Sequence, residues 1–360
     1  MKILITTNTI SDKTGTYVVL KNIIPYLMEN HEVTILTNQC HVDIKYDKLV
    51  QLSTSKIFSQ YYFTSGLSKL LHDGFFNDFD IIHAFEYPLY TTDFLTLKKS
   101  QFDAPLIISP HGSLAEFNSF PLNYLKKIHN YFMLRYKNNV SNYPACSVAE
   151  KNSLIKCGID ENKILVLPLG VESLKLDFTK RVGKNITYIG RLTKTKNVEL
   201  LIKAFAQLYN TDANLTIAGP DYGELPTLKN LVQKLKIENK VIFTGWISEK
   251  EKIDLLSKTS IFVHPSLEDI FSLSLAETSA SGVPVIAFGG TGTSEIIVDM
   301  VTGKVVKERT LESLRDAMDY ILNNPDLINK FSENGRILTT KKYNWSQTAS
   351  DLQNLYSRLI

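Results

Sequence analysis

The segment IFVHPSLEDIFSLSLAETSASGVPVIA, residues 261–287, contains one complete strand–helix–strand pattern. Two short apolar and β-branched runs, Ile261–His264 and Val283–Ala287, predict strands at its ends. The stretch between them, which carries Glu277, predicts a helix that begins soon after two adjacent acids. Strands joined by a helix pair in parallel, so the segment predicts one βαβ unit of a parallel sheet.

The same alternation runs along the chain in two successive series. The expected strands are Ile3–Thr6, Val33–Leu36, Ile81–Ala84, Leu106–Ser109 and Ala145–Val148, then Ile186–Ile189, Leu215–Ala218, Val241–Thr244, Ile261–His264 and Val283–Ala287. Two series predict an α/β protein with two doubly wound, Rossmann-like domains, over residues 1–168 and 169–344. Pro25, inside the expected helix Val18–Met28, predicts a kink or a turn. A last helix, over about 345–360 and anchored by Trp345, is expected to pack back on the first domain.

Composition and charge narrow the class of protein. The 360 residues carry 40 Lys and Arg against 37 Asp and Glu, a net charge of +3, and 44% of them are hydrophobic. These values exclude disorder and argue against nucleic acid as the main partner. No apolar run is long enough for a membrane span. The start of the chain has the pattern of a strand and not that of a signal peptide. The three cysteines form neither a metal-binding nor a disulfide pattern. We therefore expect a cytoplasmic protein.

A basic loop follows one of the expected strands. GRLTKTKN, residues 190–197, begins with a glycine that permits a tight turn and places Arg191 and Lys196 just before a helix. Two cations beside a helix N-terminus suit a phosphate or diphosphate. A solvated loop is the alternative interpretation.

Two carboxylates bracket the start of the helix in the opening segment. Glu268 and Asp269 precede the helix, and Glu277 lies eight residues after Asp269. If the helix begins early, Asp269 and Glu277 would lie on the same side of it. Ser272 lies at the expected helix start, where free backbone N–H groups favour an anion. The pattern predicts one acid on a sugar and the other on a ribose. An acid that caps the helix together with a surface Glu is the alternative.

Glycines cluster after the next strand, in GGTGTSEII, residues 289–297, where they permit close approach of the backbone to a ligand. Neither this cluster nor the single Gly15 after the first strand forms a GxGxxG pattern, which argues against a nicotinamide or flavin enzyme. No Asp-x-Asp pattern follows a strand, so no metal is expected.

Polar candidates in the first half also follow strands. His111 and Gly112 come directly after Leu106–Ser109, and a histidine at such a position can hydrogen-bond a sugar or transfer a proton. A structural histidine is the alternative. His83, at the end of its strand, could likewise face the cleft or simply cap the strand. Weaker candidates are Glu86 and Glu116.

Residues 117–149 contain no Asp or Glu, and they alternate cations with aromatic and aliphatic residues at helical spacing. This pattern over 124–137 predicts peripheral contact with an anionic membrane. A core-facing helix with a solvated basic side is the alternative.

Taken in order, these motifs resemble those of the retaining glycosyltransferases of family 4, which have the GT-B fold. The resemblance covers nearly the whole chain and is strongest from Lys163 to Gly303, where KILVLPLGVE, YIGRLTKTKNVELLIKAFAQL, LTIAGP, VIFTGWIS and the segment ending GGTGTSEII follow one another. It implies two Rossmann-like domains that face each other across a cleft. Residues 1–168 would bind the acceptor and residues 169–344 a nucleotide-sugar donor.

The resemblance also implies roles for single residues. Donor-binding residues would be Gly15, Arg191, Lys196, Ser272, Leu273 and Glu277, with the two cations on the diphosphate and Glu277 on the ribose. Asp269 would contact the transferred sugar and His111 would lie near the reacting centre. The family usually has Glu where this chain has Asp269, so whether Glu268 or Asp269 reaches the sugar stays open.

The implied activity is metal-independent transfer of a sugar, with retention of configuration, from a donor such as a UDP- or GDP-sugar to a saccharide or lipid-linked saccharide. The implied setting is cell-envelope or exopolysaccharide assembly at the inner face of the cell membrane. Asp269 and Ser272 depart from the family pattern, which motivates an alternative: a catalytically silent GT-B protein that binds sugar or a partner protein. An epimerase or phosphorylase of the same fold is disfavoured, because no sequence context for a pyridoxal-bound lysine is found.

Overall fold

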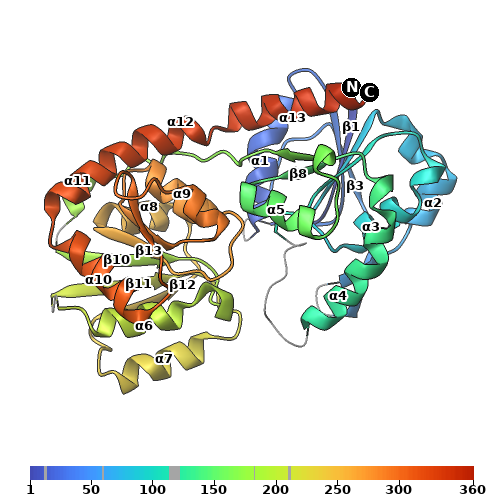
Figure 1. Ribbon diagram of the computed structural model, residues 1–360. Helices are drawn as coiled ribbons and strands as arrows, with labels where there is room; N and C mark the ends of the chain where they lie inside the picture. Colours follow the sequence, from blue (N-terminus) through green and yellow to red (C-terminus); the bar gives the residue numbers. More distant parts are fainter. Residues whose placement is uncertain (12–13, 59–60, 113–121, 182, 210–211) are drawn as a thin grey trace. The chain divides into compact units, whose positions relative to one another are not determined.

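The computed structural model describes residues 1–360 except 12–13, 59–60, 113–121, 182 and 210–211 (Figure 1). The chain divides into two compact units. Unit 1 comprises Met1–Gly170 together with Trp345–Ile360, and unit 2 comprises Val171–Asn344. Among the described helices, none is both long and apolar enough to cross a membrane.

Unit 1 is built on five parallel strands in the order β3–β2–β1–β6–β7. Their bounds are β1 (Lys2–Ile10), β2 (Glu32–Cys40), β3 (Lys48–Gln51), β6 (Ile81–Phe85) and β7 (Leu106–Ser109). Burial of every residue of β6, and of Ile3 to Thr7 in β1, is typical of central parallel strands that are covered on both faces. The first four strands predicted in this half are confirmed.

The expected strand Ala145–Val148 is wrong. The strand β8 (Tyr143–Ala145) ends at Ala145 and pairs with β9 (Ile164–Val166), and the helix α5 (Val148–Lys156) begins at Val148. Ser147 is the reason for the switch, because its side chain accepts a hydrogen bond from the backbone N–H of Glu150 and so caps the helix.

Of the kink or turn expected at Pro25, the turn is absent. The helix α1 (Gly15–Leu27) continues through Pro25, because it buries an apolar face that includes Leu20, Ile24 and Leu27 on both sides of the proline. Packing of this face fixes the helix despite the backbone hydrogen bond that a proline removes.

The last helix, α13 (Trp345–Leu359), belongs to unit 1 and packs against α1 (Figure 1). Gln353 on α13 donates a hydrogen bond to the carbonyl of Tyr26, and Thr348 donates one to the carbonyl of Pro168. Gly170 lies so close to the start of α13 that an added Cβ would be 2.4 Å from the backbone nitrogen of Trp345.

The remaining strands and helices of unit 1 follow its sheet strands in the sequence. β4 (Thr54–Phe58) and β5 (Tyr61–Thr64) form an antiparallel hairpin after β3. The helices are α2 (Leu67–His72), α3 (Tyr90–Leu97) after β6, and α4 (Leu122–Met133) after β7.

Unit 2 contains six parallel strands in the order β12–β11–β10–β13–β14–β15. Their bounds are β10 (Lys184–Ile189), β11 (Ala213–Ala218), β12 (Val241–Gly245), β13 (Ile261–His264), β14 (Val285–Phe288) and β15 (Gly303–Val306). Its helices are α6 (Val198–Ala206), α7 (Leu225–Lys234), α8 (Glu249–Lys258), α9 (Leu273–Ala280), α10 (Leu311–Leu322) and α11 (Pro325–Asn334).

Helices cover both faces of the sheet of unit 2. One apolar cluster joins the strands to α6, α7 and α10, and a second joins them to α8 and α9 (Figure 1). Two covered faces explain why β13 and β14 are buried at every residue. Both units therefore confirm the predicted α/β class and Rossmann-like sheets.

Candidate active site

The basic loop of unit 2 leaves the sheet at Gly190, directly after β10. An added Cβ there would be 2.6 Å from the hydroxyl oxygen of Tyr188, so this position needs a glycine. The Tyr188 hydroxyl donates a hydrogen bond to the carbonyl of Arg191, 2.9 Å away. The exposed guanidinium of Arg191 lies 5.7 Å from the ring centre of Tyr222, in reach of a cation–π contact.

Lys196 does not point freely into solvent. Its Nζ lies 2.5 Å from Oδ2 of Asp269, and the Nε2 of His264 lies 2.8 Å from the same oxygen. The side chains of Lys196 and Asp269 are 14% and 12% exposed, and that of His264 is 1% exposed. The structure thus brings together one predicted cation, one predicted acid and a histidine that sequence reasoning treated only as the end of a strand.

The charges in this cluster determine its protonation. Burial acts to raise the pKa of Asp269, but the Lys196 ammonium and the hydrogen bond from His264 outweigh it and lower that pKa to about 2. Burial lowers the pKa of His264, so at neutral pH its imidazole is neutral and donates from Nε2 to the carboxylate. Asp269 is therefore ionised, and the ammonium of Lys196 balances its charge.

Asp269 and Glu277 do not share a helix, which corrects the expectation of a common helix side. The helix α9 begins only at Leu273, which is half-buried, and Ser272 is its N-cap, with the hydroxyl accepting from the backbone N–H of Leu275 at 3.3 Å. Asp269 lies in the loop before the cap. The backbone N–H groups of the first turn of α9 consequently begin four residues after Asp269, at Leu273.

Glu277 is a mostly buried residue of α9 and not the surface glutamate of the alternative interpretation. Its Oε2 lies 2.8 Å from Nζ of Lys252 on α8, and the two side chains are 15% and 23% exposed. A ribose that binds Glu277 would share this carboxylate with Lys252.

The glycine cluster supports the loop that carries Asp269. The backbone N–H of Gly292 donates to the carbonyl of Asp269 at 2.8 Å, and an added Cβ on Gly292 would be 1.7 Å from the carbonyl oxygen of Ile270. At Gly292, therefore, the glycine permits close approach to another backbone segment of this protein, at Ile270. Arg309, which sequence reasoning missed, donates hydrogen bonds to the carbonyls of Leu267 and Gly289 and joins the two loops.

Glu268 lies beside this cluster and is half-buried. Its backbone carbonyl accepts a hydrogen bond from the hydroxyl of Ser266 at 3.3 Å.

In unit 1, His111 follows β7 in a left-handed backbone conformation, with a φ of 49°. Its ring stacks on Phe85 at 5.6 Å, and its Nε2 has no hydrogen-bond partner among the residues that the structure describes. Burial lowers the pKa of His111, although the neighbouring Glu150 acts in the opposite direction. A neutral imidazole with one free nitrogen can donate to or accept from a ligand hydroxyl.

Glu150 holds the loop that carries His111, and sequence reasoning missed it. Its buried carboxylate accepts hydrogen bonds from the backbone N–H groups of Gly112 and Cys146, the latter at 2.8 Å. It therefore joins the loop after β7 to the turn after β8. A glutamate in the first turn of a helix was the available signal, but only folding shows where its carboxylate lies.

Glu86 and Gly15 lie at the neighbouring carboxyl ends of β6 and β1. The Glu86 carboxylate accepts a hydrogen bond from the hydroxyl of Thr16 and a longer one, 3.4 Å, from that of Thr7. Burial raises the pKa of Glu86, and these hydrogen bonds act against the rise. Gly15 is the exposed first residue of α1, and a Cβ added to it would meet nothing within 4 Å. Glu116 lies outside the described residues.

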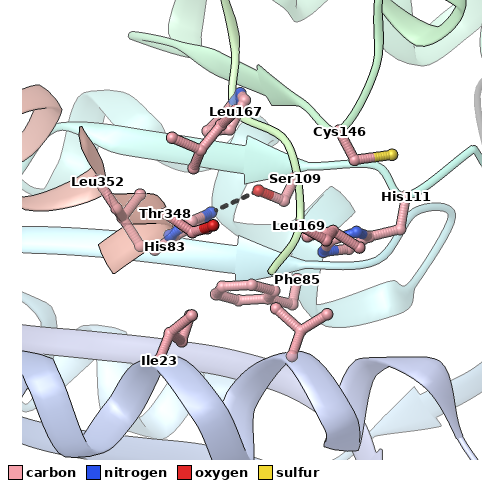
Figure 2. Close-up of a pocket in the computed structure, with 12 residues that line it drawn as sticks. Ile23, His83, Phe85, Ser109, His111, Cys146, Leu167, Leu169, Thr348 and Leu352 are labelled. Atoms are coloured by element: carbon pink, nitrogen blue, oxygen red, sulfur yellow. Dashed lines mark hydrogen bonds between the residues drawn. The ribbon is translucent and has the colours of Figure 1, made fainter. Parts of the chain in front are cut away.

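His83 proves to be a buried structural residue. One ring nitrogen lies 2.8 Å from the hydroxyl of Ser109 (Figure 2). The other lies 2.7 Å from the hydroxyl of Tyr356 on α13. It lines, with Phe85 and His111, a cavity of about 20 Å³. That volume suits one water molecule and excludes a sugar. Among the described residues, no three His, Cys, Asp or Glu side chains converge as metal ligands.

Two family models match nearly the whole chain between them. "Glycosyltransferase Family 4" matches residues 14–173 and "Glycosyl transferases group 1" matches residues 178–338.

Individual proteins resemble the chain more distantly. An uncharacterised glycosyltransferase of Methanocaldococcus jannaschii is 25% identical over 60% of this chain, and the match spans 58% of that relative's length, less than two thirds. The O-antigen chain mannosyltransferase C of Escherichia coli is 25% identical over 79% of this chain and 76% of its own. HepE of Anabaena, solved in complex with UDP and glucose, has a TM-score of 0.79 at 17% identity, covering 99% of this chain and 100% of that one.

Two Rossmann-like units of this kind define a protein of the GT-B class. With the two family models, the comparison identifies the family: the chain belongs to glycosyltransferase family 4.

Proposed function

We propose that this protein transfers a sugar from a nucleotide-sugar donor to a saccharide or lipid-linked saccharide, with retention of configuration and without a metal ion. One observation carries the proposal. Arg191, Lys196 and the Ser272-capped start of α9 all follow strands of one parallel sheet, so they lie at its carboxyl edge, where doubly wound sheets bind ligands. The HepE structures in complex with UDP and with UDP-glucose support a nucleotide-sugar donor for this fold.

The proposed chemistry uses the charges of this edge. The acceptor hydroxyl oxygen bonds to the anomeric carbon, the bond from that carbon to the diphosphate oxygen breaks, and the diphosphate takes the hydroxyl proton. Arg191, Lys196 and the N–H groups of α9 stabilise the negative charge that builds on the leaving oxygen. Asp269, ionised beside Lys196, faces the positive charge that develops on the sugar ring.

The test is transfer and hydrolysis of UDP-glucose, UDP-galactose, UDP-N-acetylglucosamine and GDP-mannose by the wild type and by Arg191→Ala/Lys196→Ala. We expect turnover in the wild type and at least a 100-fold loss in the double variant, with its fold unchanged by circular dichroism. The matched control is Lys203→Ala, which removes an exposed lysine paired with Glu199 on α6. Equal turnover by the double variant and the control would refute the assignment.

The E. coli relative, an O-antigen chain mannosyltransferase, supports a role in envelope or extracellular polysaccharide assembly. Such a role requires access to a lipid-linked acceptor. The exposed side chains along α4 and just after it suit a membrane surface: Ile128 is 41%, Tyr131 63% and Phe132 55% exposed, and Arg135 stacks on both aromatic rings. We propose peripheral contact with anionic lipids through this face.

Flotation with phosphatidylglycerol vesicles tests the contact. Tyr131→Ser/Phe132→Ser should reduce the floated fraction several-fold, whereas Tyr209→Ser, which removes an aromatic residue of unit 2 that is 73% exposed, should not. Equal flotation of the three proteins would exclude this face.

A catalytically silent sugar-binding protein stays the second candidate. The observation in its favour is that Lys196 and His264 already occupy Oδ2 of Asp269. Donor binding in a thermal-shift assay, without hydrolysis or transfer from any of the four donors, would favour it over the transferase.

A further inference from the structure

A second group of polar and aromatic side chains in unit 1 comes from four segments that follow the carboxyl ends of its strands. Tyr87 follows β6, Asp93 lies in the first turn of α3, and His129 is on α4 after β7. Tyr61 belongs to the β4–β5 hairpin, which follows β3. Because these strands are parallel, their carboxyl ends lie at one edge of the sheet, the edge at which this fold binds ligands.

The aromatic rings of this group form a continuous series. The ring centres of Phe63 and Tyr90 are 4.8 Å apart, those of Tyr90 and Tyr61 6.3 Å, those of Tyr61 and His129 5.9 Å, and those of His129 and Tyr87 5.4 Å. The series runs from the surface to the interior, because Phe63 is 40% exposed and Tyr87 is 7% exposed. We call these five residues the ring series.

Asp93 is the polar centre of the ring series. Its Oδ2 accepts hydrogen bonds from the Tyr61 hydroxyl and from Nε2 of His129, the latter at 2.7 Å. The remaining nitrogen of His129 lies 3.2 Å from the hydroxyl of Tyr87. Asp93 is 4% exposed, yet its Oδ1 has no partner among the described residues. Burying a carboxylate oxygen away from water without a hydrogen-bond donor costs free energy. The site therefore lacks one hydrogen-bond donor, for Oδ1.

We infer that the ring series and Asp93 form a binding site for a saccharide, the sugar portion of the acceptor in the proposed transfer. Sugar rings combine an apolar C–H face with hydroxyl groups. The exposed face of Phe63 and the neighbouring ring of Tyr90 suit the C–H face, and Asp93 Oδ1 suits a hydroxyl that donates to it. The inference rests on the proposed function and adds the place and chemistry of acceptor recognition.

Packing of α4 alone does not account for this composition. An apolar contact between α4 and α3 would need no buried carboxylate, because burying a charged group costs free energy. The partly exposed side chains are also the aromatic and polar ones: His129 is 25% exposed, and Tyr61 and Tyr90 are half-buried.

The experiment separates acceptor binding from donor use. Donor hydrolysis, in which water is the acceptor, is measured with the most active of the four nucleotide sugars named above. Transfer is measured to octyl glycosides of glucose, galactose, mannose and N-acetylglucosamine. Saturation-transfer-difference NMR with the corresponding methyl glycosides reports saccharide binding without any turnover.

Phe63→Ala is the principal variant, because it truncates a surface ring and spares the fold. We expect it to raise the KM for the best octyl glycoside about tenfold and to weaken the NMR signal, with the rate of donor hydrolysis within twofold of wild type. Asp93→Asn should act in the same direction. Tyr46→Ala, which truncates another exposed aromatic residue of unit 1, at 37% exposure, should change neither quantity.

Two results would overturn the inference: an acceptor KM within twofold of wild type in Phe63→Ala, or no NMR signal from any methyl glycoside with the wild type. Failure of the proposed function has a different signature, namely no hydrolysis and no transfer from any donor. In that case the NMR comparison of wild type, Phe63→Ala and Tyr46→Ala still decides whether the ring series binds a saccharide.

Discussion

Nζ of Lys196 and Oδ2 of Asp269, 73 residues apart in sequence, lie 2.5 Å apart in unit 2. The residue proposed to hold the donor diphosphate is thus paired with the residue proposed to face the sugar. The pair places Lys196 before any ligand arrives, and Nε2 of His264 lies 2.8 Å from the same carboxylate oxygen. Such a site is preorganised for charge that develops at a leaving group.

Acid should destabilise unit 2 through Asp269. Its pKa is lowered to about 2 in the folded protein, below the ordinary 3.8, so the ionised carboxylate stabilises the fold above pH 4, and this contribution of about 2 kcal/mol is lost as the pH falls from 4 to 2. Asp269→Asn should lower the free energy of unfolding at pH 7 by about 3 kcal/mol and flatten this part of the pH profile. Urea unfolding at several pH values measures both.

The control for this experiment is Asp254→Asn, which removes a carboxylate that is 48% exposed and paired with Lys258 within α8. A change of less than about 0.5 kcal/mol is expected, because exposed pairs contribute little. If both variants show the same pH profile, Asp269 is not the group that titrates.

Gly15→Ala should separate ligand contact from structure. A Cβ at Gly15 would meet nothing within 4 Å, so the melting temperature should not fall. If Gly15 contributes to the donor site, as the family resemblance implies, transfer should fall at least tenfold. Gly292→Ala is the contrasting variant. Its Cβ would overlap the Ile270 carbonyl at 1.7 Å, so stability should fall by about 2 kcal/mol or more. Full activity in Gly15→Ala would remove Gly15 from the donor site.

Glu150→Gln should impair turnover through the loop that carries His111. The carboxylate accepts from two backbone N–H groups, of Gly112 and Cys146, and an amide can accept with only one oxygen. We expect a loss of about 1–3 kcal/mol in unfolding free energy and a lower kcat, with an unchanged Kd for UDP. Glu161→Gln, at an exposed carboxylate paired with Lys151, is the control. Unaltered kcat in Glu150→Gln would show that the loop keeps its place without the carboxylate.

Tyr356→Phe should show how firmly the last helix is tied to the sheet of unit 1. The substitution leaves a buried nitrogen of His83 without its hydroxyl partner at 2.7 Å, which should cost about 1–3 kcal/mol in unfolding free energy. Tyr320→Phe, at a residue that is 49% exposed, should cost almost nothing. Equal stability of the two variants would mean that His83 finds another partner.

Much of the fold was predictable because its signals are local. Runs such as Leu106–Ser109 are buried strands, and the strand–helix–strand unit of residues 261–287 is present with its helix at Leu273–Ala280. The wrong strand, Ala145–Val148, arose where one side chain altered a local preference, because Ser147 caps a helix there. At Pro25 the buried apolar face of α1 continues the helix, so the turn that was one of two expectations is absent.

The candidate site was predictable only in part. Arg191, Lys196 and Asp269 were found because they follow strands, but the alternatives for each rested on exposure, which the sequence does not give. His264 and Glu150 were missed as members of the site, since nothing beside them in sequence signals a partner.

The sequence by itself determined the α/β class, the family and the segments from which a donor site can be built, because strand periodicity and ordered motifs are properties of neighbouring residues. Only the tertiary structure decided which side chains meet. Lys196 and Asp269 are 73 residues apart, and His83 and Tyr356 are 273 apart, yet both pairs lie within hydrogen-bonding distance. Contacts of that kind depend on the order of the strands in each sheet. That order is favoured because it buries both faces of the sheet.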